Sequence, residues 1–122
     1  MFERKDLQLE QDYEGGRDLI YYKEQFDEFE LYLEWKIPPG GNSGIFYHVQ
    51  EGYNFPGEAS PEYQLIDDVN YTKIHDVTEY NKSFGESEPE KLQDWQKTGA
   101  NYAMHTVSEG VEKVLFPAGE WN

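Results

Sequence analysis

The feature that most constrains this chain is an alternation of apolar and polar residues that runs into a turn rich in proline and glycine. The apolar side chains fall at every second position from Phe29 to Trp35, which is the spacing of a strand with one buried face. The segment Pro38–Gly44 ends this strand, because proline cannot donate to a ladder and glycine permits a tight connection. A second strand is therefore predicted at Ile45–Gln50.

Other short segments share this strand-like pattern. Pro61–Asp68 alternates clearly, whereas Asp18–Lys23, Tyr102–Val107 and Val111–Phe116 do so more weakly. One short helix is predicted near residues 88–95, because Ser87–Glu90 has the spacing of a capping box with proline in its first turn. Several short strands with a single helix predict an all-β fold, an antiparallel β-sandwich or jelly roll, as one domain over residues 1–122.

Charge and composition exclude several classes of partner. Only 10 residues are Lys or Arg against 25 Asp or Glu, which gives a formal net charge of −15. Such a surface repels phosphate backbones and anionic lipid headgroups, so neither nucleic acid nor a membrane is an expected partner. No apolar run approaches the roughly 20 residues of a membrane helix, and the stretch after Met1 is too polar for a signal peptide.

Motifs for nucleotides, nucleophiles and metals are missing from the sequence. There is no Walker loop, Rossmann fingerprint or Gly-x-Ser-x-Gly elbow. The chain has no cysteine, and its three histidines are 27 and 30 residues apart, unlike the short spacings of zinc ligands. We therefore predict no metal site and no cofactor.

The polar faces of two predicted strands are the most informative feature for function. Alternation places His48 on a face that Glu62 and Gln64 of the next strand can share, with Phe46 beside them. Carboxylates, amides and a flanking ring match the hydroxyls and C–H faces of a sugar. The alternative interpretation is that this side of the sheet is simply exposed to water.

Four sequence blocks extend this interpretation: FELYLEWKIPPGGNSGIFY at 29–47, PEYQLID at 61–67, TGANY at 98–102 and PAGEWN at 117–122. Together, and in this order, they resemble the 3-keto-disaccharide hydrolase domain family, formerly a domain of unknown function. The resemblance implies a concanavalin-like or laminin-G-like jelly roll, often periplasmic or extracellular, that acts on oxidised disaccharides or glycosides.

Members of that family usually begin with a further strand and continue through several strands beyond the PAGEWN block. We therefore expect a partial jelly roll, incomplete at both ends, whose open sheet edges can pair with another copy of the chain. Such pairing would make the protein a homo-oligomer.

The resemblance also implies a mechanism and assigns roles to residues. A ketone at C3 of a sugar acidifies the proton at C2, so that one base can generate an enolate that expels the group at C1; ordinary glycosidases instead use paired carboxylates. Glu62 is the expected base and His48 the expected acid or second base. The expected substrate-binding residues are Asn42, Ser43 and Gln64 as hydrogen-bond donors, Asp67 as an orienting or cation-holding group, and Phe46 as a flanking ring.

Two other functions remain open at this stage. A jelly roll can also serve as a non-catalytic carbohydrate-binding module, since the fold does not determine the function. Alternatively, the chain acts only as an inactive part of a larger assembly.

Overall fold

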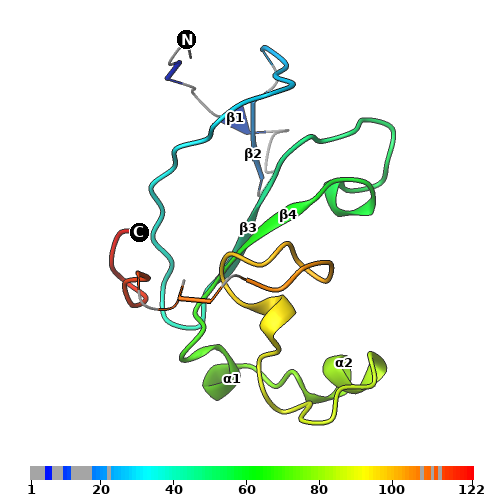
Figure 1. Ribbon diagram of the computed structural model, residues 1–122, viewed down its shortest axis with the longest axis vertical. Coiled ribbons are helices and arrows are strands. Elements are labelled where there is room, and N and C mark those ends of the chain that lie inside the picture. Colours follow the sequence, from blue (N-terminus) through cyan, green and yellow to red (C-terminus); the bar gives the residue numbers. More distant parts are fainter. Residues whose placement is uncertain are drawn as a thin grey trace. The chain divides into compact units, whose positions relative to one another are not determined.

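The computed structural model describes residues 5–6, 10–11, 18–21, 23–107, 109–110, 112 and 114–122. These residues belong to two compact units, Met1–Leu31 and Tyr32–Asn122. Figure 1 traces the chain through both units.

The first unit contains a small antiparallel sheet of two strands, β1 (Glu10–Gln11) and β2 (Leu19–Ile20). The strand predicted at Asp18–Lys23 is thus confirmed over two residues, while Tyr22 lies outside the described residues.

The second unit is organised around two antiparallel strands, β3 (Asn42–Phe46) and β4 (Glu62–Ile66). The opposite edge of β4 also carries hydrogen bonds, from the segment 98–102 that lies beside it (Figure 1). Gln64 donates its backbone N–H to the carbonyl oxygen of Ala100 at 3.1 Å and accepts from the N–H of Gly99 at 2.9 Å. Because β4 is hydrogen-bonded on both sides, its register is fixed, and so is the face that each of its side chains occupies.

The interior around β4 mixes apolar and polar side chains. Leu65, Ile66 and Ala100 are buried, and so is the hydroxyl group of Thr98. That hydroxyl donates to the carbonyl of Ile66 at 2.8 Å and accepts from its N–H at 3.0 Å. A buried polar group with partners avoids the cost of an unmade hydrogen bond, so Thr98 joins its segment to β4 through its side chain.

A buried carboxylate organises the turn that leads into β3. Asp67 accepts hydrogen bonds from the backbone N–H groups of Gly40 at 2.9 Å, Asn70 at 3.1 Å and Val69 at 3.3 Å, and from the Asn70 amide at 3.0 Å. Burial alone would raise the pKa of Asp67, but these donors outweigh it and hold the pKa below its usual value. The charged form is therefore the stable one in the folded protein.

The end of the chain pairs with the segment before the turn. Trp35 and Asn122 exchange two backbone hydrogen bonds of 3.0 and 2.9 Å, and Gly119 donates to the carbonyl of Ile37 at 2.8 Å. The Asn122 side chain also accepts from the N–H of Phe116 at 2.7 Å, which closes the loop 116–122. The PAGEWN block thus forms a compact loop against residues 35–37.

Among its described residues, the second unit also contains four short helices. Two are α-helices, α1 (Tyr71–Ile74) and α2 (Thr78–Ser83), and two are 3₁₀ turns, η1 (Pro56–Glu58) and η2 (Asp94–Gln96). The sequence patterns predicted neither α1 nor α2.

Two of the predicted strands are wrong. Residues 29–36 form no strand. Trp35 exchanges backbone hydrogen bonds with Asn122, while Phe29, Leu31 and Leu33, predicted to be buried, are 41%, 51% and 40% exposed. The segment Tyr102–Val107 turns instead of extending, because Ala103 has a φ of 59°. Part of the strand predicted at 111–116 lies outside the described residues.

The helix predicted near 88–95 is also wrong at its start. Side chains occupy the carbonyls there: Asn81 donates to those of Pro89 and Lys91 at 3.0 and 2.8 Å, and Gln93 donates to that of Glu88 at 2.9 Å. The Glu88 carbonyl also accepts from the backbone N–H of Lys91 at 3.1 Å, a single turn that does not continue as a helix, and η2 is the short helix found in this stretch.

The described part of the chain is mostly non-helical, with small antiparallel sheets and short helices. This agrees with a β fold, while the complete sandwich or jelly roll stays a prediction. No helix in the ranges given above has both the length and the apolar character needed to cross a bilayer.

Replacing the buried carboxylate tests its structural role. We expect Asp67→Asn to lower the free energy of unfolding at pH 7 by about 2 kcal/mol, because an amide cannot accept all four bonds. Because the pKa of Asp67 lies below 3.8 in the folded state, this difference should persist at neutral pH and shrink as the pH falls through that pKa. Urea denaturation at several pH values measures it.

The matched control is Glu79→Gln, at a side chain that is 85% exposed in its ion pair with Lys82. It should change stability by no more than about 0.5 kcal/mol. Equal stability of the two variants would contradict the role given to Asp67.

Candidate functional site

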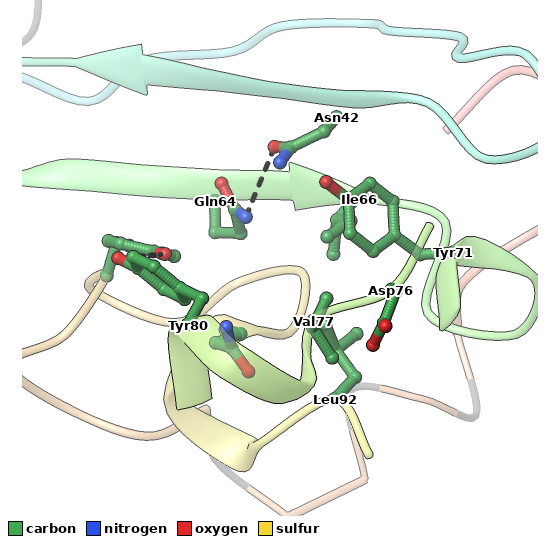
Figure 2. Close-up of a pocket in the computed structure, with 10 residues that line it drawn as sticks. Asn42, Gln64, Ile66, Tyr71, Asp76, Val77, Tyr80 and Leu92 are labelled. Atoms are coloured by element: carbon green, nitrogen blue, oxygen red, sulfur yellow. Dashed lines mark hydrogen bonds between the residues drawn. The ribbon is translucent and has the colours of Figure 1, made fainter. Parts of the chain in front are cut away.

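The register of β3 against β4 brings together side chains that are distant in sequence. Gly44 lies opposite Gln64, and Asn42 lies opposite Ile66, so Asn42 and Gln64 are diagonal neighbours on one face. The Gln64 side chain, only 2% exposed, donates from Nε2 to Oδ1 of Asn42 at 3.3 Å. Figure 2 shows the two amides facing each other between the strands.

Glu62 occupies the same face, two residues before Gln64, and lies opposite Phe46. Its side chain extends over Gly44: a Cβ atom added to Gly44 would lie 1.9 Å from Oε1 of Glu62. Partial burial of this carboxyl raises its pKa above the usual value. Gly44 therefore provides the space in which a half-buried, more basic carboxylate can lie.

A cavity of about 260 Å³ opens beside this strand pair. Its wall combines amides, phenols, a carboxylate and apolar groups: Asn42, Gln64, Ile66, Tyr71, Asp76, Val77, Tyr80, Leu92, Gln96 and Tyr102. In Figure 2, Tyr71 and Tyr80 lie on either side of the Asn42–Gln64 pair, with Val77 and Leu92 across from it. A concave wall that combines hydrogen-bonding groups with apolar side chains suits a small polar ligand.

Two tyrosines join α2 to the segment beside β4 at this cavity. The hydroxyl oxygens of Tyr80 and Tyr102 are 3.1 Å apart. Burial, and then the hydrogen bond with Tyr80, raises the pKa of Tyr102 far above its usual value, and the charge of Glu62 adds to the rise. Tyr102 therefore stays a neutral phenol and a potential hydrogen-bond donor throughout the physiological pH range.

Asp76 contributes the carboxylate of the cavity wall, whereas Glu62 lies on the same strand face outside the lining. It accepts a hydrogen bond from the backbone N–H of Thr78 at 2.9 Å. Hydrogen bonds from the side chain and backbone of Thr78 lower the pKa of Asp76, so this carboxylate is ionised at neutral pH.

Three residues assigned to the site from the sequence lie elsewhere. Ser43 lies opposite Leu65, on the other face of the strand pair. β3 ends at Phe46, and His48 has a φ of 50° in the left-handed region, so the alternation that placed His48 beside Glu62 does not reach it. The Asp67 carboxylate is occupied by its bonds to the turn. The chemical roles of these residues remain predictions.

Sequence reasoning missed Tyr80, Tyr102 and Gln96. Tyr80 comes from α2 and Gln96 from η2, two elements that hydrophobic periodicity did not predict. Tyr102 ends the TGANY block, one of the four blocks that carry the family resemblance, and this membership was a usable signal.

The described residues contain no group of three or more His, Cys, Asp or Glu side chains arranged to hold a metal ion. What the site offers is a half-buried carboxylate with a raised pKa beside neutral donors. This arrangement suits proton abstraction and the stabilisation of a developing oxyanion.

Comparison with known families gives one match that spans nearly the whole chain. Residues 4–122 match the model described as the 3-keto-alpha-glucoside-1,2-lyase-like domain. The match includes β3, β4 and the cavity beside them.

The proteins similar to this chain include one curated relative and one solved structure. A 3-keto-disaccharide hydrolase of Bacteroides thetaiotaomicron is 34% identical over 92% of the chain and 36% of its own length. The crystal structure of a candidate glycosyl hydrolase from Parabacteroides distasonis is 51% identical, with a TM-score of 0.53, over 72% of the chain and 34% of its own length. The chain thus spans about a third of each protein.

The contact between Gly44 and Glu62 yields a direct test. Gly44→Ala should leave the fold intact, since the far end of a flexible side chain can move away. It should also push the Glu62 carboxylate toward water and lower its pKa toward 4.5. The titration of the Glu62 carboxyl carbon by NMR measures this change.

Ser43→Ala is the matched control, because it alters the neighbouring residue on the opposite face and should leave the Glu62 titration unchanged. An unchanged Glu62 pKa in Gly44→Ala would show that the carboxylate does not lie over Gly44.

Proposed function

The chain belongs to the family of 3-keto-alpha-glucoside-1,2-lyase-like domains, and from this membership we propose that it is a carbohydrate-active domain that cleaves 3-keto-glycosides by elimination. The single observation that carries the proposal is the Glu62 carboxylate, half-buried over Gly44 and made more basic by that burial. Elimination beside a ketone needs one such base, whereas ordinary glycoside hydrolysis uses two carboxyl groups.

The reaction begins at C2 of the sugar, next to the C3 ketone. Glu62 takes the C2 proton, and the electron pair of the C–H bond is delocalised onto the C3 oxygen as an enolate. When the enolate collapses, the bond from C1 to the aglycone oxygen breaks and C1 and C2 become doubly bonded. Addition of water to this double bond then gives the free 3-keto sugar, so the net change is hydrolysis.

The enolate oxygen needs hydrogen-bond donors at the cavity wall. The amides of Gln64 and Asn42 and the neutral phenol of Tyr102 are suited to this role, because they need not change their charge to donate. Donors already arranged around a developing charge contribute strongly to catalysis, typically by a factor of about 10²–10³ for each one.

The leaving aglycone must gain a proton. Two groups are candidates: His48, which the sequence predicted as the acid, and Glu62 itself after it has taken the proton from C2. The exposed position of His48 beyond the end of β3 favours Glu62, because the carboxyl group then acts on neighbouring atoms of one substrate.

The names of the relatives support the same class of substrate. One relative is a 3-keto-disaccharide hydrolase and another is a candidate glycosyl hydrolase. We propose that the substrate of this chain is also a carbohydrate, namely an oxidised disaccharide or glycoside. A periplasmic or extracellular location, expected from the family resemblance, is part of the same proposal.

A non-catalytic carbohydrate-binding module is the second candidate function. It is favoured by the Asn42–Gln64 amide pair and the aromatic wall, which suit a sugar without any chemistry. Saturable binding of a 3-keto-disaccharide without turnover would select this function over the first.

Removing the base separates the two functions. Glu62→Gln should abolish release of glucose from a 3-keto-disaccharide while the dissociation constant changes by less than about tenfold, or roughly 1.4 kcal/mol. Glucose release measures turnover, and calorimetry measures binding. The unoxidised disaccharide should give no release with either protein, since its C2 proton is not acidic.

Glu51→Gln, at an exposed glutamate beyond β3, provides the control and should keep full activity. Normal turnover by Glu62→Gln would remove Glu62 from the mechanism.

The pH dependence of the reaction provides a further test. The base must be ionised to act, so kcat/KM should fall as the pH decreases through the pKa of Glu62, which lies above 4.5. In Gly44→Ala the same acid limb should move to lower pH, because the carboxyl regains solvent. If the acid limb of the kcat/KM profile does not move in Gly44→Ala, the limb reports the titration of a group other than Glu62.

A further inference from the structure

Four aromatic rings form a continuous cluster next to the cavity. Tyr80 contacts Phe84 with ring centroids 5.1 Å apart, Phe84 contacts Trp95 at 5.3 Å, and Trp95 contacts Tyr102 at 5.5 Å. All three pairs meet edge to face, an arrangement that adds stability beyond the burial of the rings. We call these four residues the aromatic cluster.

The aromatic cluster reaches from the cavity wall to solvent. Tyr80 and Tyr102 line the cavity, whereas Phe84 and Trp95 do not. Tyr80 is 48% exposed and Phe84 is 55% exposed. The two exposed rings therefore present apolar surface that is continuous with the cavity.

Polar contacts hold the cluster in place. The indole N–H of Trp95 donates to the Glu86 carboxylate at 3.0 Å, and the hydroxyl groups of Tyr80 and Tyr102 are 3.1 Å apart. Phe84 follows α2 directly and donates its backbone N–H to the carbonyl of Asn81 at 3.1 Å. The rings thus form a surface that is largely arranged before any ligand binds, which reduces the entropic cost of binding.

The size of the cavity limits what it can enclose. Its volume of about 260 Å³ lies below the roughly 300–1,000 Å³ of pockets that enclose a drug-sized ligand. It suits one sugar ring, so the second ring of a disaccharide must lie outside it. Tyr80 belongs both to the cavity wall and to the exposed part of the aromatic cluster, and so it marks where the substrate would leave the cavity.

We propose that Tyr80 and Phe84 form a binding subsite for the leaving group of the substrate, on which a sugar ring or another flat, uncharged aglycone stacks. The C–H face of a pyranose is apolar and matches the face of an aromatic ring, while its hydroxyl groups remain in water at the edges. The proposal rests on the proposed function, because the aglycone is the part of a 3-keto-glycoside that the cavity does not enclose.

The subsite predicts a preference that depends on the aglycone. Phe84→Ala should lower kcat/KM for a 3-keto-disaccharide about tenfold, and change kcat/KM for the 3-keto methyl glycoside by less than about twofold. Phe84→Trp should restore the value for the disaccharide. Phe116→Ala, at a ring that is 59% exposed outside the cluster, is the matched control and should leave both substrates unaffected.

A merely structural role for Phe84 gives a different result, since both substrates would then lose activity to the same extent. That outcome overturns the subsite. An unchanged kcat/KM for the disaccharide in Phe84→Ala overturns it as well. Because Phe84 is more than half exposed, its removal should not prevent folding, and circular dichroism of each variant verifies this.

Binding measurements keep the subsite separate from the proposed function. If the unsubstituted protein turns over neither substrate, the proposed elimination fails, and the subsite is then tested by calorimetry with the same two sugars. If Phe84→Ala binds the disaccharide more weakly but binds the methyl glycoside as before, the subsite is supported even in a protein that is not a catalyst. Equal binding of the disaccharide by both proteins, or no binding by either, refutes it.

Discussion

The arrangement of the site depends on β4 being hydrogen-bonded along both of its edges. β3 pairs with one edge, and the segment 98–102 pairs with the other, through the N–H and carbonyl groups of Gln64. A strand held on two sides cannot shift its register without breaking both sets of bonds. Glu62 and Gln64 therefore keep their face, and Tyr102 is placed next to them by its own backbone bond to the Glu62 carbonyl.

The sequence predicted β4 well and the segment before it poorly, for a physical reason. Alternation in Pro61–Asp68 coincides with a strand because that segment has partners on both sides. Phe29–Trp35 alternates just as clearly, yet alternation describes only the faces of an extended segment and does not supply a partner for its backbone. Trp35 has such a partner in Asn122, but the segment as a whole is not a strand.

The part of the site that depends on the alternation of side chains along a strand could be predicted from the sequence. The part that depends on the short helices could not. Asn42, Glu62 and Gln64 share a face because residues two apart in a strand do. His48 departs from this rule through a single positive φ angle, which no spacing indicates. Tyr80 lies on a helix of six residues, α2, and so short a helix gives almost no periodic signal. Of the tyrosine pair at the cavity, Tyr80 could therefore be placed only from the structure.

Because the Glu62 side chain lies so close to Gly44, a substitution at either position constrains which residue the other can carry. Any side chain at position 44 occupies the space of the carboxylate, so a relative can gain a Cβ there only if position 62 carries a shorter or differently directed side chain. Aspartate at position 62 together with alanine at position 44 would satisfy this steric condition. We therefore expect the two positions to covary among family members, whereas Ser43, on the far side of the strand pair, is free to change independently of both.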